Sequence, residues 1–307
     1  MTFITRFVNS ALPDTTKGIA LALVSNALFV VVGVCVRYLN ETIDVFQILF
    51  FRQLVFMTVL IPAIWKNLDV LMKPRLIQLH SLRIIAAFFA LQLGFVTVSN
   101  MPLAEATALG FTTVLFVALI SGVFLKESIG KSRQFTLIAG FTGVILVVQP
   151  SFEKMTFVYI LTGLGAAMAA AVAIFCVRKI ASTESTITLL VYQALFVGLL
   201  AFVPSLLNWQ WPTADELTLL MLVGSLSSIA QWFGVTAYKY GAANVVSNVE
   251  YTKMIYSLLL GYLLFSEIPD MISLVGAAVI ITSVLLPYFL AKIIGWQQRM
   301  GEIQAGR

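Results

Sequence analysis

The sequence predicts an all-α integral membrane protein with ten transmembrane helices, built as two inverted five-helix repeats, with the N-terminus and the C-terminus in the cytoplasm. The first observation is composition: 11% of the 307 residues are charged and 60% are apolar, whereas soluble domains carry roughly 25% and 45–50%. The second is that apolar runs of spanning length recur along the chain. The third is that residues of the two halves match at a nearly constant offset. Soluble, disordered, collagen-like and disulfide-scaffold classes are excluded by the composition.

The ten spans follow from the length of helix that crosses a bilayer, about 20 residues. Eight spans are charge-free runs, at 18–36, 84–104, 106–125, 134–152, 155–177, 185–214, 217–238 and 271–291. Two further runs have spanning length but contain charge. Residues 45–65 include Arg52, and residues 242–265 include Glu250 and Lys253.

The positions of the basic residues predict the orientation. If ten spans alternate, one side of the membrane collects only Arg37 and Lys154, and two cations lie within spans. By the positive-inside rule the other side is the cytoplasm, together with both termini. It collects Arg6, Lys17, Lys66, Lys73, Arg75, Arg83, Lys126, Lys131, Arg133, Arg178, Lys179, Lys239, Lys292, Arg299 and Arg307. Because these cations mark membrane boundaries, the net charge of +5 does not indicate nucleic-acid binding.

An internal repeat relates the two halves. Cys35-Val36-Arg37 at the end of the first span matches Cys176-Val177-Arg178 at the end of the sixth, 141 residues later, and Gly94 matches Gly234 at an offset of 140. A repeat of five helices inverts its second copy, which is the symmetry of many alternating-access transporters. The predicted organisation is a cytoplasmic segment at 1–16, repeats at 17–152 and 153–291, and a cytoplasmic tail at 292–307.

Two stretches resemble EamA-type members of the drug/metabolite transporter superfamily. Residues 100–110 read NMPLAEATALG and lead through FLKE (124–127) to GFTGVIL (140–146). Their counterpart in the second half runs from YGAAN (240–244) through FSE (265–267) to Gly276. The resemblance covers nearly the whole chain and implies the same five-plus-five helices and transport of a small polar metabolite. The opening through FRQ (51–53) also resembles the branch that includes S-adenosylmethionine uptake carriers. The resemblance fixes neither substrate nor direction, and the charges in span nine depart from the usual apolar pattern of the family.

The charged residues inside spans are the first candidates for a substrate site, because each costs about 2.5–3.5 kcal/mol to insert. Glu250 and Lys253 stand three residues apart on one predicted helical face, so they can form an internal salt bridge. Alternatively, they line a central polar cavity together with Arg52. We favour the cavity because the matching positions of the first half, Gly110 and Thr113, carry no charge.

The expected cavity includes polar and aromatic residues of several spans. In this hypothesis Arg52 or Lys253 pairs with a substrate anion, and Glu250 pairs with an amine or carries a coupling proton. Any single aromatic residue can equally contact lipid or pack internally. The remaining expected substrate-binding residues are Gln92, Tyr192, Gln193, Gln231, Trp232, Ser247, Tyr251 and Met254.

Other ionisable residues have simpler interpretations. Glu105, after Pro102, is expected to cap a helix rather than to form an outer gate. His80, the single histidine, is expected at the membrane interface, and a cytoplasmic pH sensor is the alternative.

A secondary transporter in the bacterial inner membrane is the function favoured. No metal, cofactor or nucleotide site is expected, and the expected partners are a small-molecule substrate, lipid and a coupling proton or exchanged solute. The oligomeric state is left open. The rivals are a ligand-binding receptor or assembly protein without transport, an intramembrane enzyme, and a channel. The enzyme is disfavoured because one histidine and no Asp within a span leave few catalytic groups.

Overall fold

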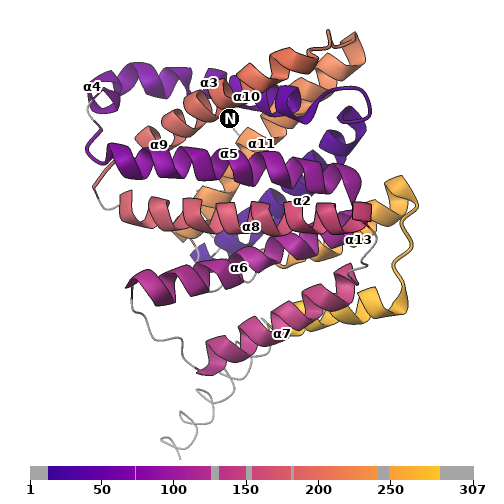
Figure 1. Ribbon diagram of the computed structural model, residues 1–307. Coiled ribbons are helices and arrows are strands. Elements are labelled where there is room, and N and C mark those ends of the chain that lie inside the picture. Colours follow the sequence, from indigo (N-terminus) through magenta and orange to yellow (C-terminus); the bar gives the residue numbers. More distant parts are fainter. Residues whose placement is uncertain are drawn as a thin grey trace, which may run out of the picture.

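The computed structural model describes residues 13–72, 74–125, 131–149, 154–180, 183–240 and 249–283. Every regular element in these ranges is helical (Figure 1). Residues 1–12, 73, 126–130, 150–153, 181–182, 241–248 and 284–307 lie outside the described residues. The expectations for the two cytoplasmic end segments therefore stay predictions.

The first predicted repeat contains five long helices and one short turn. The long helices are α2 (Asp14–Leu39), α3 (Val45–Lys66), α5 (Ile77–Asn100), α6 (Leu103–Leu125) and α7 (Lys131–Val148), and the turn is α4 (Leu68–Leu71). Local chemistry sets some of the bounds. Asp44 accepts a hydrogen bond from the backbone N–H of Phe46 at 2.8 Å and so caps the start of α3.

The second predicted repeat begins with α8 (Lys154–Ile180). The next span is not one uniform helix: it consists of α9 (Thr186–Tyr192), a π-helical turn η1 (Gln193–Val197), α10 (Gly198–Ser205) and a 3₁₀ turn η2 (Leu206–Asn208). It is followed by α11 (Ala214–Tyr240), α13 (Thr252–Phe265) and a last helix at Met271–Ser283. Ser266, in the left-handed conformation with φ 54°, ends α13.

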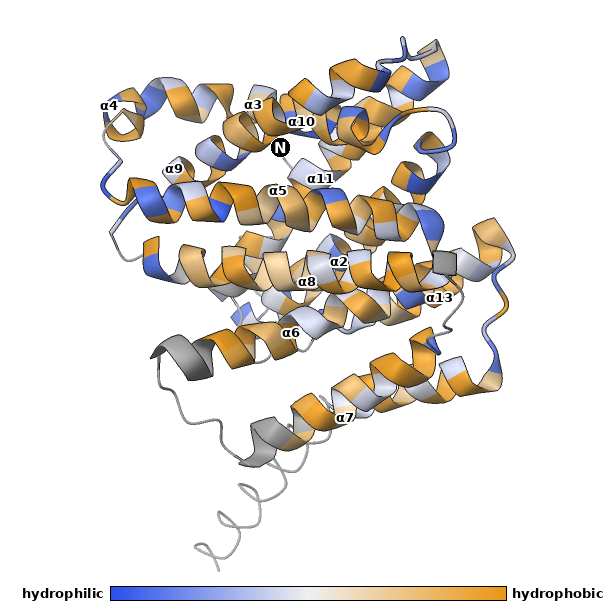
Figure 2. Ribbon diagram, in the orientation of Figure 1, coloured by the Kyte–Doolittle hydropathy of each residue, from blue (hydrophilic) through white to orange (hydrophobic). Residues whose placement is uncertain are grey.

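Length and composition identify membrane helices within the described ranges. Seven helices are long and apolar enough to cross a bilayer, and three shorter apolar helices cover Leu137–Val148, Thr252–Phe265 and Met271–Ser283. Large apolar side chains such as Ile138 and Val203 are exposed on the outside of the bundle. Figure 2 shows apolar residues along the helices and hydrophilic residues gathered toward helix ends and connections. This distribution is that of an integral membrane protein; the count of ten spans and the orientation stay predictions.

Helices of the two predicted repeats pack against each other rather than forming separate bundles. Helix α5 lies along α8, and α2 lies along α11 (Figure 1). The helix α7 and the last helix cross closely at two glycines. A Cβ added to Gly143 would lie 2.9 Å from the carbonyl oxygen of Gly276, and a Cβ added to Gly276 would lie 2.8 Å from that of Gly143. Small residues permit such close approach in lipid.

Candidate substrate site

The packing of α3 on α11 places Arg52. A Cβ added to Gly224 of α11 would lie 2.5 Å from the Cβ of Val55, so the absence of a side chain at Gly224 lets the two helices approach here. One turn of α3 earlier, the Nε of Arg52 donates a hydrogen bond to the Oγ of Ser227 at 3.1 Å. Arg52 is 8% exposed. The guanidinium is therefore held between helices of the two predicted repeats.

The charge of Arg52 is not matched within the described residues. None of the ion pairs found there includes Arg52, and its Nη1 is buried without a hydrogen-bond partner. Two glutamines show related features: both amide atoms of Gln53 and the Oε1 of Gln92 are buried and unpartnered. Buried polar groups nearly always find a partner, so these side chains mark where a polar ligand or water would complete the hydrogen bonding. Gln53 was not expected from the sequence.

The structure joins Glu250 and Lys253 in an ion pair, with side-chain exposures of 40% and 27%. The internal salt bridge considered as an alternative is thus present. Glu250 precedes α13, whose first residue is Thr252, so the single helical face expected from the spacing is interrupted there. Among the described residues, the pair is joined to Arg52 by neither an ion pair nor a hydrogen bond; the hydrogen bond of Arg52 goes to Ser227.

Helix α2 supports the start of α13. The amide Nδ2 of Asn26, which is 1% exposed, donates to the carbonyl oxygen of Val249 at 2.8 Å and to the Oγ1 of Thr252 at 3.3 Å. The Nζ of Lys253 lies 5.5 Å from the ring centre of Phe29, within cation–π range. Asn26 lies in an apolar run and was not singled out from the sequence, although a polar side chain amid apolar neighbours is the signal that could have found it.

The other expected residues occupy varied positions. Met254 is fully buried in an apolar cluster with residues of α6, α7 and α8, and Tyr251 packs against the same cluster. Trp232 is 51% exposed, whereas Gln231 is half-buried. Ser247 lies outside the described residues.

Tyr192 and Gln193 bind other groups of the protein near the first turns of α5. The Oε1 of Gln193 accepts from the Nη2 of Arg83 at 2.7 Å, and the Nη1 of Arg83 donates to the carbonyl oxygen of Leu189 at 2.9 Å. The hydroxyl of Tyr192 donates to the carbonyl oxygen of Leu71 at 2.6 Å. Arg83, expected among boundary cations, is only 4% exposed because these acceptors draw it into the protein.

His80 is also buried, at 2% exposure; its expected position at the membrane interface stays a prediction. Its Nε2 lies 2.8 Å from the Oε2 of Glu184, in the connection between α8 and α9. The Oε1 of Glu184 accepts from the backbone N–H groups of Arg75 and Leu76 at 2.9 and 3.1 Å. Burial alone would raise the pKa of the Glu184 carboxyl, but the hydrogen bonds from His80 and from this backbone hold that pKa below its usual value.

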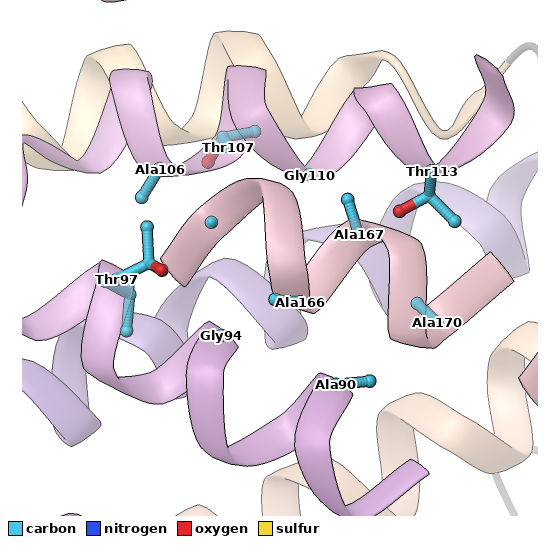
Figure 3. Close-up of a pocket in the computed structure, with 12 residues that line it drawn as sticks. Ala90, Gly94, Thr97, Ala106, Thr107, Gly110, Thr113, Ala166, Ala167 and Ala170 are labelled. Atoms are coloured by element: carbon cyan, nitrogen blue, oxygen red, sulfur yellow. The ribbon is translucent and has the colours of Figure 1, made fainter. Parts of the chain in front are cut away.

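Two pockets lie apart from Arg52. One, of about 250 Å³, lies between α5, α6 and α8 and is lined by small residues and threonines such as Gly94, Thr97 and Gly110 (Figure 3). The other, of about 410 Å³, lies where α6, α7, α13 and the last helix end or begin, and includes Glu105 and Asp270. Glu105 stands in the first turn of α6, as expected for a carboxylate at a helix start.

Sequence comparison assigns the family. The sequence model of the EamA-like transporter family matches residues 16–149 and 157–289, one match for each predicted repeat. The chain belongs to the EamA-like transporter family. The EamA match covers most of the chain and agrees with the membrane helices of the structure. The resemblance noted in the sequence is thereby confirmed.

Several proteins similar in sequence to this chain are named as transporters. An S-adenosylmethionine uptake transporter of Rickettsia felis is 27% identical, with 93% of this chain and 97% of that protein covered. A pseudopaline exporter of Pseudomonas aeruginosa is 27% identical, with 87% of this chain and 94% of that protein covered. A riboflavin transporter of Vibrio cholerae is 30% identical, with 67% of this chain and 69% of that protein covered. A crystal structure with 17% identity and a TM-score of 0.67, covering 92% of this chain and 98% of that one, shares the fold. These findings support membrane transport of a metabolite.

Proposed function

We propose that the protein is a secondary transporter of the bacterial inner membrane, and that Arg52 binds an anionic group of a small polar metabolite. The observation that carries this proposal is a buried guanidinium with one hydrogen bond and no carboxylate partner among the described residues. A charge held inside a membrane protein requires compensation. A substrate carboxylate supplies it with the planar, two-oxygen geometry that guanidinium groups prefer.

The proposed substrate class rests on the charged side chains expected from the sequence to line the site. An amino-acid-like solute carries a carboxylate suited to Arg52 and an amine suited to a carboxylate such as Glu250. S-adenosylmethionine, named for one relative, has both groups. This supports an amino acid, amine or related charged solute as cargo, and S-adenosylmethionine as the first compound to test.

Alternating access follows from the inverted repeat. Two matching halves can pack in two equivalent ways, each open to one side of the membrane. Arg52 lies where α3 of the first half meets α11 of the second, which suits a site that both packings share. Movement of substrate would be driven by an ion gradient, by exchange, or by the gradient of the substrate itself.

The test of the proposed site is ligand binding by purified protein. Thermal shift would be screened over amino acids, amines, nucleoside-linked metabolites and carboxylates, because a ligand that binds the folded state raises apparent stability. We expect hits to carry a carboxylate, and Arg52→Met to weaken them at least about 30-fold, the effect of losing about 2 kcal/mol from a buried charged contact. Val203→Ala, at an exposed residue outside the candidate site, is the control. Unchanged affinity in Arg52→Met would overturn the proposal.

The role of Glu250 is tested separately by transport in proteoliposomes. If Glu250 carries a coupling proton or binds the substrate amine, Glu250→Gln changes the pH dependence of uptake or the apparent affinity. Lys253→Met is the matched variant, because it removes the other member of the ion pair without removing the carboxylate. A Glu250→Gln protein with the affinity and pH profile of the wild type would remove Glu250 from the mechanism.

A further inference from the structure

The strongest additional feature is a contact between the two predicted repeats near the first turn of α5. Glu184 belongs to the connection between α8 and α9, in the second repeat, and its carboxylate accepts three hydrogen bonds from the first repeat. The donors are the backbone N–H groups of Arg75 and Leu76 and the Nε2 of His80. The α5 helix has no cap of its own at Leu76. The carboxylate of Glu184, from the second repeat, therefore caps the N-terminus of α5, where negative charge is favoured.

The side chains of Tyr192 and Arg83 surround the contact between Glu184 and His80 and join the same helices. The ring of Tyr192 lies 5.1 Å from that of His80, and its hydroxyl ties α9 to the carbonyl oxygen of Leu71. Arg83 ties α5 to the carbonyl oxygen of Leu189 on the same stretch of α9. Helix α4 and the starts of α5 and α9 lie at the same side of the molecule in Figure 1. By the predicted orientation, this is the cytoplasmic side.

The opposite side holds a contact related by the inverted repeat. There the Oγ1 of Thr42, between α2 and α3, donates to the carboxylate of Glu216 in the first turn of α11. Thr42 and Thr183 are 141 residues apart, as are Arg75 and Glu216, the same offset that relates the cysteines. Each contact therefore joins the connection after the first helix of one repeat to the start of the third helix of the other. The outer contact uses a hydroxyl, whereas the inner contact uses a histidine.

We propose that His80 and Glu184 form a proton-sensitive cytoplasmic latch, which must part before the transporter opens to the cytoplasm and which closes more firmly when the cytoplasm becomes acidic. Rocking of inverted repeats separates the halves at one side at a time, so a contact between halves at that side opposes opening. This inference rests on the proposed transport function for its biological role, but the latch is measurable without a substrate.

The direction of the pH effect follows from the hydrogen bonds. An ionised Glu184 requires a hydrogen on the Nε2 of His80 in either charge state, so the second proton goes to Nδ1, which is buried and has no hydrogen-bond partner among the described residues. The bond from Nε2, already charge-assisted by the ionised carboxylate, then joins two opposite charges, and the added Coulomb attraction strengthens it. The imidazolium also faces the Tyr192 ring. The other charged or titratable groups around His80 are Arg83 on α5, and Cys176, which faces Arg83 from α8.

The latch is tested by distance measurements between spin labels in the full-length protein in lipid nanodiscs. The inner pair is Asp69→Cys and Thr183→Cys, both at exposed positions on the two sides of the latch. The background carries Cys35→Ala and Cys176→Ala, since both native cysteines are buried. From pH 8 to pH 5.5, the ratio of short to long distances should rise about fivefold, which corresponds to about 1 kcal/mol of added attraction between the imidazolium and the carboxylate.

Two comparisons decide the interpretation. His80→Gln retains a hydrogen-bond donor for Glu184 but does not titrate, and its inner pair should be insensitive to pH; Glu184→Gln should be equally insensitive. An outer pair at Glu41→Cys and Ala214→Cys, also exposed, should show no corresponding rise in short distances. A wild-type inner pair without a pH response, or a response that persists in His80→Gln, would overturn the latch. A normal latch response in a protein that transports nothing would instead refute the proposed function.

Discussion

Replacing Arg52 by methionine is expected to stabilise the protein in the absence of substrate while abolishing substrate binding. An arginine within a membrane helix costs about 2.5–3.5 kcal/mol. In the described part of the chain Arg52 recovers one hydrogen bond, to Ser227, worth about 1.5–3 kcal/mol because the donor is charged, and no ion pair. Methionine retains an apolar stem without the charge. The free energy of unfolding should therefore rise by up to about 2 kcal/mol, the difference between these two terms.

The assay is thermal unfolding of purified protein in detergent, with and without ligand. Arg83→Met is the matched control. Arg83 is also buried, also lacks an ion pair among the described residues and also has one unpartnered nitrogen, its Nε, but it donates two hydrogen bonds, to the Leu189 carbonyl and the Gln193 amide oxygen. We expect Arg52→Met to unfold several degrees above the wild type and Arg83→Met below it. If Arg52→Met is destabilised as much as Arg83→Met, the guanidinium of Arg52 is a satisfied structural group, and the reasoning behind the substrate site fails.

Three further predictions concern the scaffold. Gly143→Ala should lower the unfolding temperature by an amount equivalent to about 1–3 kcal/mol, because the new Cβ would lie 2.9 Å from the Gly276 carbonyl oxygen; unchanged thermal unfolding would contradict the close crossing. Glu267→Gln should cost about 1.5–3 kcal/mol in the same assay, since its carboxylate pairs with Arg37, and Arg37→Gln should then add little further cost. Hydrogen bonds from Gln149 and then from backbone lower the Asp270 pKa, so its stabilising effect should be present above the ordinary aspartate pKa and be lost as pH falls through the lowered value. A stability difference between wild type and Asp270→Asn that persists unchanged below about pH 3 would contradict this.

The class of protein was predictable from the sequence because lipid restricts composition strongly. Apolar runs long enough to cross a bilayer must form helices there, and the structure places helices along each predicted run where its residues are described. The repeat was recognisable at the ends of the first and sixth spans, and the family model matches each half. Charge inside a span also identified Arg52, whose burial the structure shows.

The partners of the polar residues were not predictable. Glu184 looks like an ordinary carboxylate before a helix start, and its link to His80 joins residues 104 positions apart. Arg83 was placed at the boundary because sequence position gives depth in the membrane but not the direction in which a side chain points. The π-helical turn at Gln193–Val197 has no pattern in its apolar sequence. These features depend on how the two halves pack, which spacing within one helix does not determine.

Counterflow in proteoliposomes distinguishes a carrier that binds its substrate through Arg52 from a protein that does not. Vesicles loaded with unlabelled S-adenosylmethionine or methionine would receive the same labelled compound outside, for the wild type, Arg52→Met and protein-free vesicles. We expect vesicles with the wild type to accumulate at least one of the two labelled compounds transiently. Vesicles with Arg52→Met should accumulate neither compound above the level of protein-free vesicles. Accumulation of neither compound by the wild type, or equal accumulation by Arg52→Met, would contradict a carrier that binds the carboxylate of its substrate through Arg52.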